Sequence, residues 1–151
     1  MDYDVLLKKA AACCSRQEMC NYDIDTKLRH WGAGEKQAKE IIHYLEKERY
    51  IDAERYCRAF VNDKLRFNKW GKLKIAQALA AKRIENSIVE QVLSEIELSL
   101  YEKMLLEILS KKVKEIVAAS DYERRGKLIN FALQRGFDYE TAERAAKKVL
   151  K

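Results

Sequence analysis

The sequence predicts an all-α protein made of three similar modules of three helices each. Its 151 residues contain no proline and only five glycines, and its plentiful lysine, glutamate, leucine and alanine are strong helix formers. One pattern also occurs three times: a turn residue is followed six residues later by apolar residues at i, i+3, i+4 and i+7, which share one helix face. Repetition of this kind indicates an array that presents a long surface to a partner. The turn residues are Gly32, Arg83 and Gly136.

The first module is expected to cover residues 1–50. A capping box of Ser15 with Glu18 predicts the start of its second helix, and Gly32 predicts the turn before its third. The N-terminus lacks a basic leader before its short apolar stretch, so no signal peptide is expected. No apolar run approaches the roughly 20 residues of a membrane span, so no membrane partner is expected. The helices are expected near 3–14, 16–30 and 35–48.

The second module is expected to cover residues 51–97. Asp52 is the expected N-cap of its first helix, and Gly71 marks the turn before its second. A capping box of Ser87 with Glu90 predicts the start of its third helix. The helices are expected near 53–68, 72–82 and 87–97.

The first helix of the middle module has an amphipathic pattern. One face is apolar, and we expect the aromatic residues that recur at helical spacing, Tyr50, Tyr56, Phe60 and Phe67, to belong to the core and not to a binding platform. The opposite face is basic and polar. The apolar face contains Ala53, Tyr56, Cys57, Phe60 and Val61, and the opposite face contains Arg55, Arg58, Asn62 and Arg66.

The third module is expected to cover residues 98–151. A capping box of Ser120 with Glu123 predicts the start of its second helix, and Asp138 is the expected N-cap of its third. The apolar set of the last helix is mostly alanine, which fits either close helix packing or a terminal unit with little to bury. The helices are expected near 99–118, 121–135 and 139–150.

All the excess positive charge lies in the middle module. The net charge is +6. Residues 62–84 contain seven basic residues and one acidic residue, Asp63, whereas the rest of the chain has 23 basic and 23 acidic residues. Positive charge at a helix start, as at Lys72 and Lys74, is unfavourable by about a few tenths of a kcal/mol. These lysines are therefore expected to have a role other than stabilising the helix.

We expect these cations to contact acidic protein groups or a DNA backbone. Arginine forks match phosphate and carboxylate oxygens, and a concentrated positive field attracts polyanions or an acidic protein face. The alternative is a solvated helix face without a partner. Trp31 and Trp70 lie beside turn glycines and either cap the core between modules or stack on a nucleobase. The candidate contact residues are Arg55, Arg58, Arg66, Lys69, Lys72, Lys74, Lys82 and Arg83.

The sequence contains no constellation of residues that indicates catalysis. The metalloprotease, serine-hydrolase and phosphate-binding loop motifs are absent, and His30 is expected on the surface at a helix end. Three of the four cysteines lie within residues 13–20, and none forms a CxxC pair. Neither a metal site nor a disulfide framework is expected, and a reducing cytoplasm fits best. We therefore expect a non-enzymatic protein without cofactor or metal.

Several short segments follow one characteristic order along nearly the whole chain. They are Ser15–Glu18, Lys27–Gly32, the stretch YIDAERYCRAFV at 50–61 with Arg66, Gly71, Lys72, Ile75, Leu79 and Ile84, and Arg135–Asp138. Together these segments resemble the RecX family of regulators of the RecA recombinase.

The resemblance implies three tandem three-helix repeats in an elongated, curved molecule. It implies binding along the groove of a RecA filament on single-stranded DNA, with inhibition of recombinase and ATPase activity, and hence a role in recombination, DNA repair and the SOS response. Some family members bind DNA themselves, so a protein that acts directly on single-stranded DNA or RNA is the alternative. We expect a cytoplasmic monomer whose partner is the RecA filament.

One position departs from the family pattern. The family usually has glycine where this chain has Arg83. A non-glycine residue in the left-handed conformation costs about 1 kcal/mol. Either this turn is built differently, or the added cation contributes to binding.

Overall fold

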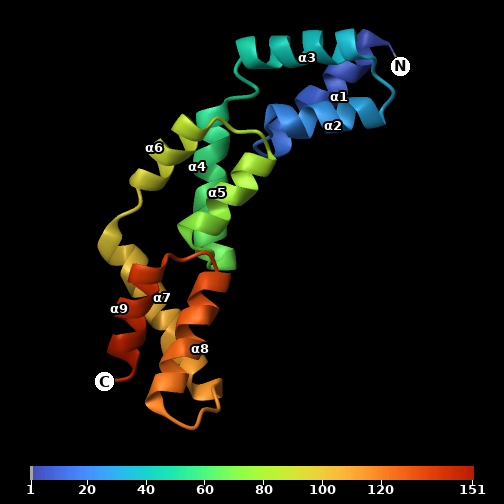
Figure 1. The fold of residues 1–151 in the computed structure, drawn as a ribbon. Coiled ribbons are helices and arrows are strands. Elements are labelled where there is room, and N and C mark those ends of the chain that lie inside the picture. The colour runs from blue at the N-terminus through green and yellow to red at the C-terminus, as the bar shows by residue number, and fades with distance from the viewer. Residues whose placement is uncertain (1) are drawn as a thin grey trace. The chain divides into compact units, whose positions relative to one another are not determined.

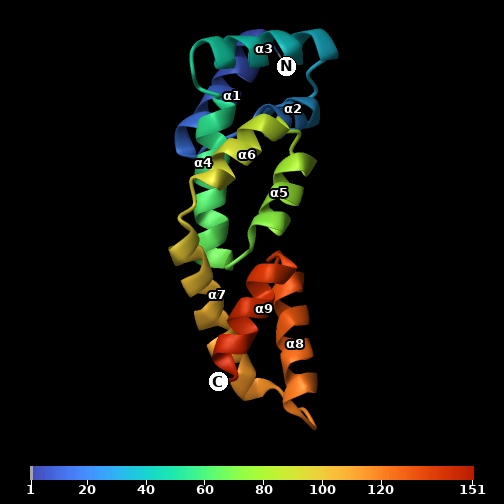
Figure 2. The ribbon, with the colours of Figure 1, turned by 60° about the vertical axis from the view of Figure 1, so that its left-hand side comes forward.

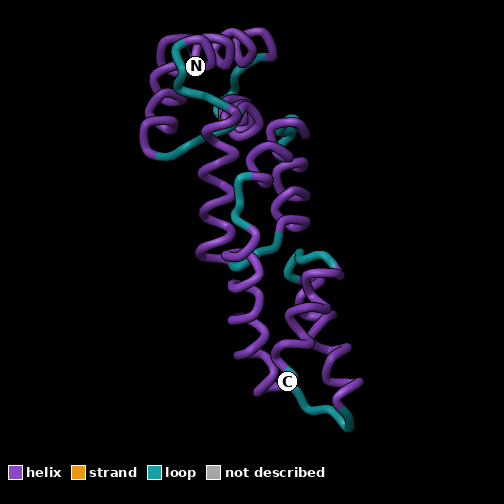
Figure 3. The backbone as a smooth tube through the Cα atoms, turned by 90° about the vertical axis from the view of Figure 1, so that its left-hand side faces the viewer, coloured by secondary structure: helices purple, strands orange, loops and turns teal. Residues whose placement is uncertain are grey.

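Helices account for all the regular structure in the computed structural model, which describes residues 2–151. No strand occurs within that range (Figure 3). The predicted all-α class is therefore confirmed. A π-helical turn, η1 (Lys64–Asn68), continues α4, and a 3-10 turn, η2 (Val113–Glu115), continues α7. The α-helices are α1 (Tyr3–Arg16), α2 (Asn21–His30), α3 (Glu35–Lys47), α4 (Ala53–Asp63), α5 (Lys72–Ala81), α6 (Asn86–Ser94), α7 (Leu98–Lys112), α8 (Asp121–Gln134) and α9 (Tyr139–Val149).

Three predicted N-caps are confirmed. The hydroxyl of Ser120 accepts the N–H of Glu123 at 3.1 Å, and the Glu123 carboxylate accepts the N–H of the residue before the cap at 3.1 Å. The arrangement is that of a capping box, except that the return bond goes to Ala119 and not to the N–H of Ser120 itself. Asp52 and Asp138 each accept the N–H three residues into their helices, at 2.9 and 3.1 Å. These side chains fix where α4, α8 and α9 begin.

The two other predicted capping boxes are wrong. Ser15 lies inside α1, where its hydroxyl donates to the carbonyl of Ala11 at 3.1 Å, and α2 begins only at Asn21. The apolar spacing of α1 continues to a buried Cys13, so the helix carries on through the serine. Helix α6 begins one residue before Ser87, whose hydroxyl donates to the neighbouring Glu85 carboxylate at 2.9 Å instead of capping.

The described residues group into two compact units. One contains the chain up to Phe60 together with 79–89, and the other contains 61–78 together with 90–151. Helices α4, α5 and α6 thus each contribute residues to both units. The repeat boundaries at 1–50, 51–97 and 98–151 stay predictions.

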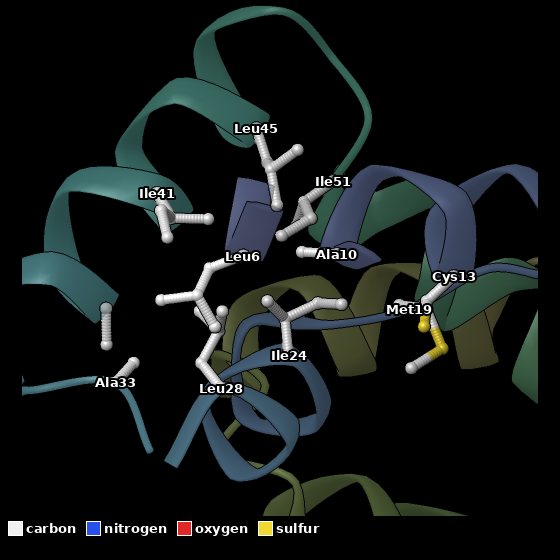
Figure 4. Packing of buried hydrophobic residues seen from close by; sticks show 11 residues of the cluster. Leu6, Ala10, Cys13, Met19, Ile24, Leu28, Ala33, Ile41, Leu45 and Ile51 are labelled. Carbon is white, nitrogen blue, oxygen red and sulfur yellow. The ribbon is translucent and has the colours of Figure 1, made fainter. Parts of the chain in front are cut away.

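In the first unit, α1, α2 and α3 enclose one apolar core (Figures 1 and 4). The predicted face of α3 is confirmed, since Ala38, Ile41 and Leu45 are buried and Ile42 packs against them. Trp31 packs at the edge of this core. The other central side chains are Leu6, Ala10, Ile24 and Leu28.

In the second unit, α9 packs against both α7 and α8 (Figure 2). The alanines of α9 are buried in this contact, so the alanine-rich set reflects close helix packing. Phe137 is fully buried, with its ring centroid 5.1 Å from that of Tyr101. The remaining large core residues include Leu105, Leu109 and Leu128.

The prediction that Tyr50 and Phe67 belong to the core is wrong. Tyr56, Cys57 and Val61 are buried as predicted, but Tyr50 is 38% exposed and Phe67 is 75% exposed. Tyr50 lies in the loop before α4 and not on the helix face. For Phe67 the reason is the π-helical turn η1, whose wider winding shifts the residues after Asp63 away from the face extrapolated with the 3.6-residue period.

None of the helices within residues 2–151 is both long and apolar enough to cross a membrane. All four cysteines are free thiols, and Cys13, Cys20 and Cys57 are buried.

Candidate interaction surface

The eight candidate cations divide between the two compact units. Arg55, Arg58, Lys82 and Arg83 belong to the first unit. The second unit contains the others, which are Arg66, Lys69, Lys72 and Lys74.

Arg55 is engaged in contacts within its own unit. Its Nε donates to the Glu18 carboxylate at 2.6 Å, and its Nη2 donates to the carbonyls of Arg49 and Tyr50 at 3.1 and 3.2 Å. The hydrogen bond to Glu18 raises the pKa of Arg55. Three acceptors for one guanidinium show that this side chain ties the start of α4 to the preceding loop and to the segment before α2.

The other first-unit cations lie at α4 and at the turn after α5. Arg58 is half-buried and forms an i,i+4 pair with Glu54 at 3.1 Å. Lys82 Nζ donates to Asp23 at 2.5 Å, and this bond raises the pKa of Lys82. Arg83 is exposed, and its guanidinium carbon lies 5.5 Å from the ring centroid of Tyr22. Arg83 is thus the least constrained of the four.

The turn at Arg83 has the same construction as the two glycine turns. Gly32, Arg83 and Gly136 have φ of 91°, 60° and 98°. In each turn the next residue donates its N–H to the carbonyl five residues before it, at 2.9, 3.1 and 3.1 Å. This is the Schellman ending of a helix. The explanation that the turn at Arg83 is built differently is therefore excluded. Arg83 adopts the left-handed conformation, which is less favourable for arginine than for glycine.

In the second unit, Trp70 is the centre of a small cationic cluster. Lys64 Nζ lies 4.8 Å and Lys74 Nζ 4.7 Å from its ring. The N–H of Lys72 donates to the Tyr101 hydroxyl at 2.9 Å, and its ammonium lies 4.9 Å from the Tyr101 ring. Burial raises the pKa of Tyr101 to about 12, so the hydroxyl stays protonated at neutral pH. The lysines at the start of α5 are thus held by aromatic rings.

The π-helical turn before Trp70 presents two further cations. Arg66 lies with its guanidinium carbon 5.6 Å from the ring of exposed Phe67. Lys69 is exposed and has a left-handed φ of 57°. A π turn followed by a left-handed non-glycine residue is an unfavourable backbone arrangement that is common at functional sites.

Two residues of this surface were missed as candidates from sequence. Arg135 donates Nη1 to the carbonyl of Asn68 at 2.9 Å, and Lys64 contacts Trp70. Lys64 lies in the basic segment at 62–84 but outside the candidate set. Arg135 precedes the turn residue Gly136 as Lys82 precedes Arg83, and that parallel could have revealed it.

The arrangement can bind anions but offers no catalytic geometry within residues 2–151. No three histidine, cysteine or acidic side chains of that range converge to hold a metal ion, and both histidines are exposed. Fold and surface together define an all-helical protein with cationic surfaces supported by aromatic rings.

The chain belongs to the RecX family. The model of the second three-helix domain of RecX matches residues 52–93, and that of the third three-helix domain matches residues 101–146. Together they cover more than half of the chain.

Curated relatives carry the same family name. The protein named "Regulatory protein RecX" from Neisseria meningitidis is 28% identical over 142 residues, which span 94% of this chain and 89% of that one. Its namesake from Clostridium acetobutylicum is 28% identical over 131 residues, or 84% of this chain, but this covers only 60% of the clostridial protein. The family is one of regulatory proteins and not of enzymes, in agreement with the prediction.

Solved structures show the same fold. The crystal structure of RecX from Lactobacillus salivarius matches with a TM-score of 0.87 at 20% identity, over 97% of this chain and 96% of that one. A second structure, of regulatory protein RecX, matches with a TM-score of 0.80 at 19% identity, over 96% of this chain and 73% of that one.

Proposed function

We propose that this protein binds RecA filaments on single-stranded DNA and inhibits their recombinase and ATPase activities, thereby modulating homologous recombination and DNA repair. Family membership is the observation that carries the proposal. The concentration of charge supports it, because the family's middle domain coincides with the segment that contains the whole excess of positive charge. We further propose that the protein acts as a cytoplasmic monomer.

The contact residues in this proposal are the exposed or half-exposed cations of the middle module. Arg66, Lys69 and Arg83 are exposed, and within residues 2–151 none has an ion pair to an acidic side chain. Such cations can pair with carboxylates or phosphates of a partner without first losing an internal bond. Arg55 and Lys82 are engaged internally and are expected to contribute less.

The test is DNA-dependent ATP hydrolysis by RecA with and without stoichiometric amounts of this protein. We expect inhibition, and no effect at stoichiometric amounts would contradict the proposal. Binding of single-stranded DNA is measured in parallel at two salt concentrations without RecA. Tight binding with a steep salt slope would favour direct action on nucleic acid.

Two variants separate binding from folding. Arg83→Gly and Lys69→Gly each remove a cation at a position where φ is positive, so glycine is the better backbone residue. We expect each to need a several-fold higher concentration for half-inhibition while folding at least as stably. Arg49→Gly is the matched control, because Arg49 also has a positive φ of 62° but lies outside the candidate set. It should inhibit like the parent chain.

A further inference from the structure

The second unit contains a hollow of about 360 Å³ that shares Lys69 with the proposed contact surface and is otherwise lined by residues outside the candidate set. Its walls come from Lys69 just after the η1 turn, from α7 with η2, and from Phe131 and Arg135 at the end of α8. A volume near the lower end of the range for ligand sites, roughly 300–1,000 Å³, leaves room for one or two side chains of a partner.

The floor of the hollow is apolar. Met104, Ile108 and Phe131 are half-buried and pack on the core of the second unit. Methionine adapts its shape at binding surfaces because it is unbranched and polarizable. The floor therefore suits an apolar side chain.

Four cations surround this floor, and they are held in two different ways. Lys112 and Arg135 lie over the ring of Phe131, at 4.6 and 5.2 Å from its centroid. Lys69 and Lys111 are exposed, and no acidic side chain within residues 2–151 forms an ion pair with either. Two cations are thus fixed beside the aromatic ring, and two remain available at the rim.

The positive charges of Lys112 and Arg135 are only partly neutralised. Lys112 pairs with Glu115 at 3.3 Å, but that carboxylate side chain is 70% exposed. Arg135 uses one nitrogen for the carbonyl of Asn68, which is uncharged. Glu107 also lines the hollow, so positive charge exceeds negative charge there by two.

The chemistry of the hollow favours an acidic protein segment over a nucleic acid. Lys112 and Arg135 lie over the Phe131 ring and hinder face-to-face stacking of a base, whereas Met104 and Ile108 suit an apolar side chain. Glu107 and Glu115 repel any anion, and a run of phosphates carries a charge at every step and cannot avoid them. A peptide can place single carboxylates only beside Lys69 and Lys111, on either side of an apolar side chain, and so keeps its charges away from the two glutamates.

We propose that this hollow is a docking site for an acidic peptide segment of a partner protein, with an apolar side chain on the Met104–Ile108–Phe131 floor and carboxylates at the rim. Lys69, at the rim of the hollow, keeps a left-handed conformation at an energetic cost, which fits a position kept for binding. The proposal holds whether or not the partner is RecA.

The test uses the full chain and a fluorescein-labelled ten-residue peptide in which aspartate and glutamate surround a Phe-Leu pair. Fluorescence anisotropy should show saturable binding. We expect Lys111→Glu to weaken binding of the peptide about fivefold and Lys69→Gly about threefold, because each variant loses one solvent-exposed ion pair with the peptide. Replacing Phe-Leu by Ser-Ser should also weaken binding.

Two matched controls keep the proposal falsifiable. Lys103→Glu makes the same charge reversal on α7 outside the hollow, and Arg49→Gly makes the same cation-to-glycine change in the first unit. Both should bind like the parent chain. The proposal is overturned if the peptide does not bind, if the controls weaken binding as much as the test variants, or if labelled oligothymidylate binds this hollow more tightly, with Lys111→Glu abolishing that binding. RecA is absent from the assay, so its result is independent of the ATPase test.

Discussion

Gly71 packs backbone to backbone against Gly136. A Cβ added to Gly71 would lie 2.4 Å from the carbonyl carbon and oxygen of Gly136. The N–H of Gly71 donates to the carbonyl of Arg135 at 2.7 Å, and the N–H of Leu73 donates to the carbonyl of Gly136 at 2.9 Å. The start of α5 is thereby joined to the turn between α8 and α9 without any side chain in between.

Replacing Gly71 should therefore destabilise the second unit. We expect Gly71→Ala to lower the free energy of unfolding by about 1–3 kcal/mol, because the methyl group must displace backbone atoms. Urea unfolding followed by circular dichroism measures the change. The matched control is Gly126→Ala: Gly126 lies exposed within α8 with no atom within 4 Å of an added Cβ. Alanine there should stabilise the helix by about 0.5–1 kcal/mol, and equal effects at the two glycines would contradict this account.

The left-handed conformation of Arg83 predicts a difference between two substitutions. Arg83→Ala and Arg83→Gly both remove the guanidinium that lies near Tyr22. Only glycine relieves the backbone cost of a φ of 60°. Arg83→Gly should thus be more stable than Arg83→Ala by about 1 kcal/mol. The two variants are compared by urea unfolding at neutral pH, and equal stabilities would mean that the turn changes its conformation in the variants.

The N-cap Asp52 predicts a pH dependence of stability. The N–H of Arg55 that it accepts is the main cause that lowers the pKa of Asp52 below its ordinary 3.8. A carboxyl whose pKa is lower in the folded state stabilises the fold above its unfolded-state pKa, and this stabilisation disappears as the pH falls through the folded-state pKa.

Substitution of Asp52 measures this contribution. We expect Asp52→Ala to lower the free energy of unfolding by about 1 kcal/mol at neutral pH. At about pH 2, where the aspartate is protonated, we expect the difference in free energy of unfolding between variant and parent chain to be smaller. Urea unfolding at both pH values gives the two free energies. An equal difference between variant and parent chain at the two pH values would show that the charged carboxylate of Asp52 is not what stabilises the fold.

The thiols predict slow alkylation of the folded chain. Burial raises the pKa of Cys14 to about 11, and the other three cysteines are buried. Since the thiolate is the reactive form, iodoacetamide at about pH 8 should modify Cys14 roughly 100-fold more slowly than in the chain unfolded by urea. Mass spectrometry of timed samples measures this ratio. Rapid modification of the folded chain would show that the first unit opens readily.

Much of the fold could be predicted from sequence because its signals are local. The N-caps at Asp52, Ser120 and Asp138 and the Schellman turns depend on residues within one helical turn. The π-helical turn could not be predicted, since no glycine or proline marks it within residues 64–68. Its consequence was the wrong placement of Phe67.

The candidate surface was harder to predict than the fold. Charge counting finds cations but not their partners, so Arg55 could not be distinguished from Arg66 before the bond to Glu18 was known. The contribution of α7 and α8 to the hollow beside Lys69 depends on contacts across more than thirty residues of sequence. No local pattern encodes such contacts.

The Schellman turns at Gly32, Arg83 and Gly136 also provide matched probes of local opening. Ala33, Ile84 and Phe137 each have an amide hydrogen that is bonded to a carbonyl five residues earlier, in the same geometry. Because the bonds are alike, differences in their deuterium exchange rates would report differences in the free energy of opening around them, and not differences in bond type. The exchange rates then show how the residue with positive φ, glycine in two turns and arginine in one, affects local opening of the helix end.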